Sequence, residues 1–375
     1  MGGPAKDIIY RIPLYYLARL GLVEPGTPFN LTFSLTNICQ SRCKTCKIWD
    51  LYNQNPEKRC EELTIQEIEK VFITMGHIPI FNISGGEPFL RNDIAEIIDL
   101  ACRYLRPGII HIPTNAISMD RVEKKTVAIL DVIDQYDPSV RLTVKPSMDH
   151  LDERHDEIRG IPGNFKRVME LFRRLKVIQR RYPNLHAELG TVISAWNVRD
   201  IGEIAAFISS LGADSYRNEI AERRSEMFNE EDEITPDTVH YEKAISYFVA
   251  ELKKNMKNRS LFQRSTNAFR LQYYRLAISI LKEKRQVIPC YAGISNVHMS
   301  PYGDIWPCCT LGYERSMGNV REYNYDFQMI WSGERAKRIR KYIKNRNCYC
   351  PLANQAYSNI LMHGPSILRV LHEMI

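Results

Sequence analysis

The residues best suited to chemistry are three cysteines in the stretch TNICQSRCKTCKIW, residues 36 to 49. Cys39, Cys43 and Cys46 follow the spacing C-x3-C-x2-C. Three close thiolates can hold zinc with a distant fourth ligand, or bind three irons of a 4Fe-4S cube. Structural zinc sites typically use paired C-x2-C segments and four ligands. A cube with three protein ligands leaves one iron open for a small molecule that offers amine and carboxylate groups.

A second group of cysteines lies near the other end of the chain. No signal peptide is visible, so we expect a cytoplasmic protein in a reducing compartment, where cysteines serve metal or redox chemistry rather than disulfides. We interpret Cys60 and Cys102, which stand apart, as ordinary surface or core thiols. The second group comprises Cys290, Cys308, Cys309, Cys348 and Cys350.

Length and composition indicate one large α/β domain with a smaller unit. The chain has 375 residues, of which 44% are hydrophobic and 25% charged, values ordinary for a globular protein. Its net charge of +7 is modest for this length and makes a nucleic-acid partner unlikely. The apolar N-terminal stretch is interrupted by Arg11, Pro13 and Arg19, so we predict no transmembrane segment there.

Between residues 30 and 220, short β-branched runs alternate with amphipathic stretches of helical period, which predicts repeated βα units. The first helix has a capping box, Thr64-x-x-Glu67, and the next four begin near Asn92, Asp120, Asn164 and Asn197, which can cap free amides. The six predicted strands are residues 30–36, 78–84, 108–115, 140–147, 187–194 and 212–220.

Six parallel strands with helical crossovers form an open sheet or a partial barrel, and both place the active site at the carboxyl ends of the strands. The three-cysteine loop directly follows the first strand, so it lies at that rim. We predict a helical connector over 222–288, with its charges on solvated faces. From Cys290 onward we expect a hairpin of two short strands around the sequence Pro-Tyr-Gly-Asp.

These patterns predict five regions along the chain. They are an amphipathic helical segment over 1–28, a barrel over 29–221, the connector over 222–288, a cysteine-rich unit over 289–355 and an amphipathic helix over 356–375. Both terminal segments have an apolar face with a few basic residues. We expect each to pack on the barrel, with a peripheral membrane or lipid-substrate role as the alternative.

The first cysteine motif resembles that of the radical S-adenosylmethionine (SAM) enzymes, in which C-x3-C-x2-C follows the first strand. The resemblance implies an α/β fold with a partial (β/α)6 TIM-like barrel, and a 4Fe-4S cluster on Cys39, Cys43 and Cys46. It also implies that the open iron binds the methionine end of SAM. Reductive cleavage of SAM then yields a 5'-deoxyadenosyl radical that abstracts a substrate hydrogen, with the protein positioning the cofactors.

Further stretches carry the same resemblance. SGGEP, Ser84 to Pro88, matches the GGEP motif after the second strand, which implies that Ser84, Gly85, Gly86 and Glu87 bind SAM; Glu87 pairs with its ammonium group or orders the loop. Residues 146–168 resemble the fourth-strand segment in which Ser-x-Asp is followed by a helix carrying HDxIRG, and this resemblance implies that Ser147 contacts the ribose or the methionine carboxylate. PTNAI places Asn115 beside the cofactor. Thr45 departs from the family, which often has an aromatic residue there.

The second cysteine group resembles the SPASM or twitch extension of this family. Cys290, Gly303 and Cys308 give C-x12-G-x4-C, and residues 317–331 resemble its G-N-x-x-E and downstream tryptophan stretch. The C-x2-C-x5-C-x3-C run of a full SPASM unit is missing. We therefore expect a small C-terminal α+β iron-sulfur domain with one auxiliary 4Fe-4S cluster, and zinc as the alternative. Its expected ligands are Cys290, Cys308, Cys348 and Cys350, with Cys309 as a substitute.

Several single residues are weaker candidates. His111, His150 and His155 lie near strand ends, where acid-base chemistry is conceivable, but single histidines are more often structural. Arg217 and Glu219 could contact SAM or substrate, or form a salt bridge within the barrel. We assign no catalytic side chain from the sequence.

The predicted activity is radical SAM chemistry on a peptide or protein side chain, by analogy with enzymes that carry the extension. The alternative substrate is a lipid, isoprenoid or other small molecule, since fold does not choose substrate. A non-catalytic zinc or iron-sulfur binding protein is the competing class. The implied partners are SAM, the substrate and an electron donor such as flavodoxin or ferredoxin.

Overall fold

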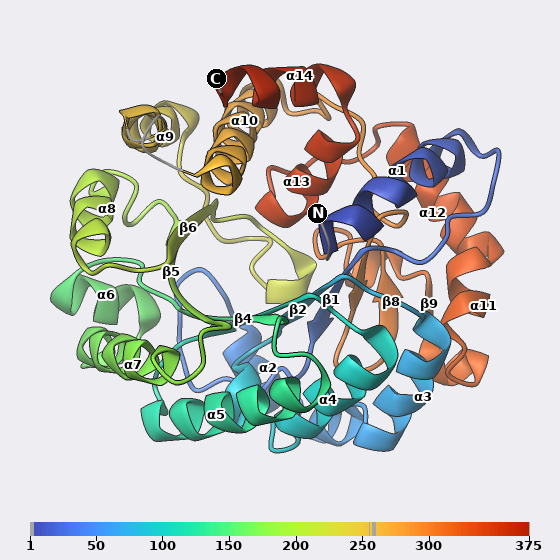
Figure 1. Ribbon diagram of the computed structural model, residues 1–375, viewed down its shortest axis with the longest axis horizontal. Coiled ribbons are helices and arrows are strands. Elements are labelled where there is room, and N and C mark those ends of the chain that lie inside the picture. Colours follow the sequence, from blue (N-terminus) through green and yellow to red (C-terminus); the bar gives the residue numbers. More distant parts are fainter. Residues whose placement is uncertain (1–3, 255, 257–259, 375) are drawn as a thin grey trace.

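A single sheet organises the protein, and its strands come from both ends of the chain (Figure 1). The computed structural model describes residues 4–254, 256 and 260–374. Within them the sheet has nine strands. They are β1 Asn30–Ser34, β2 Ile80–Ser84, β3 Ile109–Thr114, β4 Arg141–Pro146, β5 Leu185–Ile193, β6 Ser215–Ile220, β7 Asn296–Met299, β8 Asp304–Trp306 and β9 Gly318–Asn319.

The strand order is β6-β5-β4-β3-β2-β1-β7-β8-β9. Strands β1 to β6 are parallel and consecutive, as in a partial barrel, so the predicted fold class is confirmed. Strand β7 pairs in parallel with β1, with Asn30 opposite Asn296, and β8 and β9 add antiparallel pairs. The C-terminal strands therefore extend the barrel sheet beyond β1.

Helices α3 to α8 surround the barrel, while α9, α10, α13 and α14 lie together beside β6 (Figure 1). The helices are α1 Pro4–Leu20, α2 Leu51–Gln54, α3 Ile65–Met75, α4 Ile94–Leu100, α5 Met119–Tyr136, α6 Asp152–Arg159, α7 Asn164–Gln179, α8 Ile201–Ser210, α9 Thr238–Lys254, α10 Leu261–Glu283, α11 Phe327–Ser332, α12 Glu334–Lys344, α13 Ala353–Leu361 and α14 Gly364–Glu373.

The predicted capping box of α3 is confirmed. The Thr64 side chain accepts a hydrogen bond from the Glu67 amide, and the Glu67 side chain accepts one from the Thr64 amide. The other four helices begin close to the predicted residues, but the predicted residues do not cap them, because Asp93, Ser118, Gly163 and Asp200 hold the N-cap positions of α4, α5, α7 and α8. Asn164 and Asn197 instead use their side chains in buried bonds to the loops at the strand ends.

The hydrophobic core lies between the strands and the outer helices. Helix α3 buries Ile68, Val71, Phe72 and Met75, a spacing that puts all four on one face. The Phe72 ring meets Phe33 of β1 and Phe81 of β2 edge to face, with centroids 6.3 and 5.9 Å apart. This packing fixes the two strands whose ends carry the cysteine loop and the glycine pair.

Two other predicted elements differ from the structure. The first part of the predicted connector, residues 222–237, has only a short turn of 3-10 helix at Ser225–Met227, and Glu226 there is buried rather than solvated. The helical prediction holds from α9 onward. The predicted C-terminal helix is two helices, α13 and α14, which are separated around His363 just before Pro365.

The N-terminal helix α1 packs against the structure through part of its surface. The buried Tyr15 ring lies beside Phe29, and Arg19 donates a hydrogen bond to the carbonyl oxygen of Cys290 at 3.2 Å. Its remaining face exposes apolar side chains such as Tyr10 and Leu17. No helix in the described residues is both long and apolar enough to cross a membrane.

Candidate functional site

The three-cysteine loop begins at the carboxyl end of β1 and is held on one side by the glycine pair after β2. The amides of Gly86 and Glu87 donate to the carbonyl oxygens of Thr36 and Ile38 at 2.7 and 2.8 Å. A Cβ atom at Gly86 would lie 2.4 Å from the Ile38 oxygen, and Gly85 has a φ of +115°. Both positions therefore need glycine to let the two loops meet.

The end of α6 holds the other side of the loop. The amides of Arg42 and Lys44 donate to the carbonyl oxygens of Arg159 and Ile158 at 3.0 and 2.9 Å. Gly160 follows with a φ of +66°, and a Cβ atom there would lie 2.5 Å from the Arg42 oxygen. The HDxIRG stretch thus supports the cysteine loop through its backbone.

A cavity of about 190 Å³ opens beside the three cysteines. Its lining comes from the carboxyl ends of β1 to β5, as expected for a barrel site. It brings together every predicted residue of the first site except Glu87. The predicted residues that line it are Cys39, Cys43, Cys46, Ser84, Gly85, Gly86, Asn115 and Ser147.

The thiols of this site are poorly suited to exist as free thiolates. Burial, with the neighbouring Cys43 thiol as a smaller cause, raises the pKa of Cys46 to about 12 and that of Cys39 further. Arg159 donates to the Cys43 sulfur at 3.2 Å, and Asn115 lies 3.7 Å from the Cys39 sulfur. A bound cation would provide the positive charge that keeps three thiolates deprotonated in one place.

The first site offers three cysteines beside a cavity, whereas a structural zinc site closes around four ligands. Three thiols beside open space fit a cube with one open iron better than a structural zinc ion.

Glu87 has a supporting position. Its side chain accepts hydrogen bonds from the amides of Phe89 and Asn115 at 3.2 and 2.7 Å, and from the Thr114 hydroxyl at 3.0 Å. Burial raises its pKa to about 7 against the effect of these bonds. Because Glu87 does not line the cavity, the loop-ordering alternative fits its contacts better than pairing with SAM.

The sequence analysis missed one wall of the cavity, the segment 221–234. The Lys47 amide donates to the Met227 carbonyl oxygen at 2.9 Å, and the Asn229 side chain donates to the Thr45 oxygen at 2.8 Å. The sequence feature that could have indicated this wall is an apolar pair, Met227 and Phe228, inside a charged run. The segment lines the cavity with Ala221, Glu222, Arg224, Met227 and Ile234, and Arg159, Trp49 and Thr45 line it elsewhere.

The second cysteine site is smaller. Cys290, Cys308, Cys348 and Cys350 line one cavity of about 40 Å³ together with apolar side chains such as Ile288 and Leu311. Gln286 donates to the carbonyl oxygen of Cys348 at 2.8 Å and fixes the last cysteine pair against α12. The four predicted ligands are therefore brought together from three separate segments.

Cys309 is not among the residues that line this smaller cavity. Its sulfur accepts a hydrogen bond from Arg224 at 3.4 Å and lies near Glu226 and His298. The predicted role of Cys309 as a substitute ligand for the auxiliary cluster is thus disfavoured by its position. Cys60 is exposed and Cys102 is buried, in agreement with their interpretation as surface and core thiols.

The second site is positioned by the hairpin β7–β8. Gly303 of C-x12-G-x4-C sits in the hairpin turn with a φ of +89°, where a Cβ atom would lie 2.5 Å from Val320. Trp331 is fully buried, stacks on Phe327 and donates to the Gly26 carbonyl oxygen at 3.1 Å. The glycine and tryptophan of the motif therefore shape the hairpin and its support.

The weaker candidates lie outside both cavities. His155 accepts from the Asp149 amide at 3.1 Å and contacts Asn164 at 3.0 Å, and burial lowers its pKa to about 4. His150 accepts from the Leu151 amide and contacts Asp200. Arg217 forms an ion pair with Glu188 at 2.6 Å. Neither His111 nor Glu219 lines either cavity, so structural roles fit this group best.

Fold and site together define a class of protein: a partial barrel with an open three-cysteine centre and a second four-cysteine centre. Comparison with known families agrees with this class. Residues 33–208 match the radical SAM superfamily, and residues 290–351 match the SPASM iron-sulfur cluster-binding domain. The chain therefore contains a radical SAM domain and a SPASM domain, and these domains imply a 4Fe-4S cluster, SAM and auxiliary iron-sulfur clusters.

Individual relatives are distant. The chain is 22% identical over 321 residues to the antilisterial bacteriocin subtilosin biosynthesis protein AlbA of Bacillus subtilis, covering 84% of this chain and 62% of AlbA. It is 26% identical over 327 residues to an AdoMet-dependent heme synthase of Methanosarcina barkeri, covering 84% and 85%. The chain thus spans less than two thirds of AlbA.

The fold is similar to that of Streptococcus suis SuiB, with a TM-score of 0.59 and 16% identity over 90% of this chain and 72% of SuiB. At this identity the similarity concerns the fold alone. It agrees with the six-stranded barrel and its C-terminal extension.

Proposed function

We propose that this protein is a radical SAM enzyme that abstracts a hydrogen atom from a peptide or protein side chain. The observation that carries the proposal is the single cavity in which Cys39, Cys43 and Cys46 meet the predicted SAM-binding residues. Three thiols line it from the loop after β1, and the polar groups come from the ends of β2, β3 and β4.

Cys39, Cys43 and Cys46 hold a 4Fe-4S cluster in this proposal. Such a cluster supplies the electron that breaks a carbon–sulfur bond of SAM, which gives methionine and the 5'-deoxyadenosyl radical. Gly85 and Gly86 expose backbone groups at the cavity wall, where they can meet the amino-acid end of SAM. Ser84, Asn115 and Ser147 offer hydroxyl and amide groups to the rest of that ligand.

Cys290, Cys308, Cys348 and Cys350 hold one auxiliary 4Fe-4S cluster in the same proposal. Four cysteines complete the ligand set of a cube. The cavity of about 40 Å³ leaves little room for a further ligand. This site therefore suits electron transfer or shaping of the substrate chamber.

Two lines of support favour a peptide substrate. AlbA is named as a bacteriocin biosynthesis protein, and a structure of SuiB is described as bound to its precursor peptide SuiA. The SPASM match covers residues 290–351 of this chain.

A small-molecule substrate is the second candidate. The match to the AdoMet-dependent heme synthase spans 85% of that protein, against 62% of AlbA. The chain also has only one four-cysteine site in its C-terminal part, so it lacks ligands for two auxiliary clusters. Lipid and isoprenoid substrates belong to the same candidate class.

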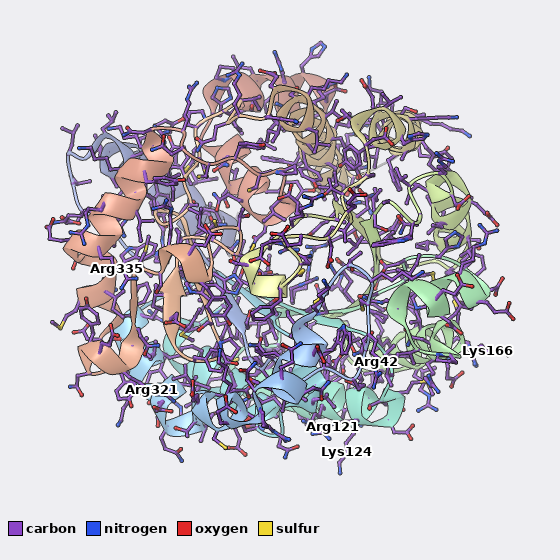
Figure 2. All side chains as sticks on the ribbon, turned by 180° about the vertical axis from the view of Figure 1, so that it is seen from behind. Arg42, Arg121, Lys124, Lys166, Arg321 and Arg335 are labelled. Carbon is purple, nitrogen blue, oxygen red and sulfur yellow. The ribbon has the colours of Figure 1, made fainter. Side chains whose placement is uncertain are left out.

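The proposal includes a cytoplasmic location and an acidic electron donor such as flavodoxin or ferredoxin. Arg42 and Lys44 interleave with the cysteines of the first loop and are exposed. Figure 2 shows Arg42 on the same side of the molecule as Arg121, Lys124 and Lys166. A basic surface beside the first cysteine loop would steer an acidic partner toward it.

Anaerobic reconstitution with iron and sulfide, followed by SAM and dithionite, tests the proposed activity. Wild-type protein should form 5'-deoxyadenosine, and changing Cys39, Cys43 and Cys46 to Ala should abolish it. The matched control is Cys60→Ala, which removes an exposed cysteine and should leave the rate unchanged. No cleavage of SAM by fully reconstituted, reduced wild-type protein would refute the proposal.

The substrate class is tested separately by product mass. Short peptides encoded beside this gene should change in mass in the presence of SAM and dithionite, with the change lost in the triple cysteine variant. Modification of a porphyrin precursor of heme or of an isoprenoid lipid, with the peptides unchanged, would replace the peptide substrate by the second candidate.

A further inference from the structure

A third group of potential metal ligands lies apart from both cysteine cavities. Glu226 comes from the turn after β6, His298 from β7 and Cys309 from the segment after β8. One ligand atom from each lies within 4.8 Å of the others, and no other group of three such residues in the described chain is so closely spaced. Glu226 and His298 are only 5% and 3% exposed.

The distances between these atoms approach those of a tetrahedral site. The His298 Nε2 and Glu226 Oε1 atoms are 3.4 Å apart. A zinc ion at about 2.0–2.2 Å from nitrogen and oxygen would hold them about 3.3–3.5 Å apart. The sulfur would lie about 3.6 Å from each by the same geometry, so Cys309 needs to move by roughly 1 Å at most.

The histidine is already oriented for this arrangement. Its register in β7 is set by pairing with β1, and the Trp306 ring lies 5.0 Å away on the neighbouring strand. The Ser34 hydroxyl lies 2.8 Å from His298 Nε2 and 3.2 Å from Glu226 Oε1, so three polar atoms converge on one point. A buried carboxylate and imidazole are costly unless such a partner is present.

Arg224 contacts the group without excluding a cation. It donates to the Cys309 sulfur at 3.4 Å and lies 3.7 Å from a Glu226 oxygen. Arg159 makes the same kind of contact, at 3.2 Å, to Cys43 of the first site. A metal-bound thiolate keeps lone pairs that can accept such a bond, and outer donors of this kind orient metal ligands.

We propose that Glu226, His298 and Cys309 form a mononuclear divalent metal site, suited to zinc and separate from both iron-sulfur sites. Nitrogen, oxygen and sulfur ligands together match the ligand set that zinc accepts, and three protein ligands leave a fourth position open. Arg224, which bounds the group, also lines the larger cavity.

Metal analysis of the reconstituted protein tests this site. Both iron-sulfur sites are filled first, then zinc is added, excess metal is removed by desalting, and zinc, iron and sulfide are counted. Wild-type protein should retain one zinc per chain. His298→Ala and Cys309→Ala should each lower zinc affinity at least about 100-fold with iron and sulfide unchanged. Cys60→Ala should retain zinc as wild type does.

A second probe keeps the test decisive if these variants fold poorly. Cobalt(II) added to reconstituted wild-type protein should give the visible bands of tetrahedral, thiolate-ligated cobalt and saturate at one equivalent. Three results would each overturn the proposal. They are wild-type zinc retention no greater than that of Cys309→Ala, loss of iron in step with zinc uptake, and the absence of a tetrahedral cobalt signal. None of these readouts depends on SAM cleavage, so they remain valid even if the proposed activity fails.

Discussion

The two cysteine-lined cavities differ in what surrounds the sulfurs. The first has three cysteines on one loop, a volume of about 190 Å³ and polar groups from the ends of several strands. The second has four cysteines from three segments and a volume of about 40 Å³. The comparison indicates that a missing fourth cysteine and free space occur together, which agrees with the proposal that the first site binds a further ligand and that four cysteines complete the second.

Removing one cysteine from each site should give the largest contrast. Cys46→Ala should abolish 5'-deoxyadenosine formation, because the SAM-binding cluster loses one of only three ligands. Cys348→Ala should leave SAM cleavage measurable while substrate modification falls, since the damaged site is the closed one. Product analysis by chromatography measures both. The contrast would be removed if Cys348→Ala lost SAM cleavage as fully as Cys46→Ala does while its iron content showed that the first cluster was still present.

The backbone support of the first loop predicts a large effect on stability at Gly160. Gly160→Ala adds a Cβ atom 2.5 Å from the Arg42 oxygen at a φ of +66°. We expect a loss of about 3 kcal/mol in the free energy of unfolding and release of iron from the first site first. Thermal unfolding and iron content measure this.

Gly212 is the matched control for this change. Its φ is +68°, but nothing lies within 4 Å of an added Cβ atom. Gly212→Ala should therefore cost only the backbone strain, about 1 kcal/mol, and spare the iron. Equal costs at the two glycines would show that the contact with the cysteine loop contributes nothing.

The basic surface beside the first loop predicts a smaller, donor-specific effect. Arg42→Glu combined with Lys124→Glu should slow SAM cleavage driven by reduced flavodoxin about tenfold at low salt, because steering of the acidic donor is lost. Cleavage driven by dithionite should be unchanged. Arg335→Glu is the control, since Figure 2 shows Arg335 well away from Arg42. An equal loss with both reductants would contradict docking at this surface.

The last prediction concerns Glu87 and the pH dependence of the free energy of unfolding. Burial raises its pKa to about 7 in the folded protein, whereas an unfolded glutamate titrates near 4.3. The protonated side chain therefore stabilises the fold fully below about pH 4, and this contribution falls as the pH rises to about 7. Relative to Glu87→Gln, wild-type protein should lose about 3 kcal/mol from pH 4 to pH 8 in denaturant unfolding. Parallel stability curves would contradict the raised pKa.

Local patterns allowed much of the fold and first site to be predicted. The six strands follow β-branched runs, and the capping box of α3 is readable because both partners are within four residues. Gly85 and Gly86 were placed correctly beside the cavity, but the close approach that requires them is to the carbonyl oxygens of Thr36 and Ile38. These contacts join the loops that follow β1 and β2. Because the two loops are distant in the sequence, neither contains a local pattern that predicts the contacts.

The missed features depend on distant contacts. Glu226 lies in a charged run that predicts a solvated helix, and only packing against the cysteine loop and β7 buries it. Cys309 is adjacent to Cys308, so spacing alone cannot show that its sulfur faces Glu226 instead of the auxiliary cavity. Side-chain direction after a short strand is set by the sheet, which the sequence pattern does not describe.

The difference between an open and a closed site is tested most directly by electron paramagnetic resonance of the reduced, reconstituted protein. Adding SAM should change the signal of the cluster on Cys39, Cys43 and Cys46 and leave that of the second site unaltered. In the variant with these three cysteines changed to Ala, the remaining signal should not respond to SAM. A SAM-dependent change in that variant, or none in the wild-type protein, would contradict the account.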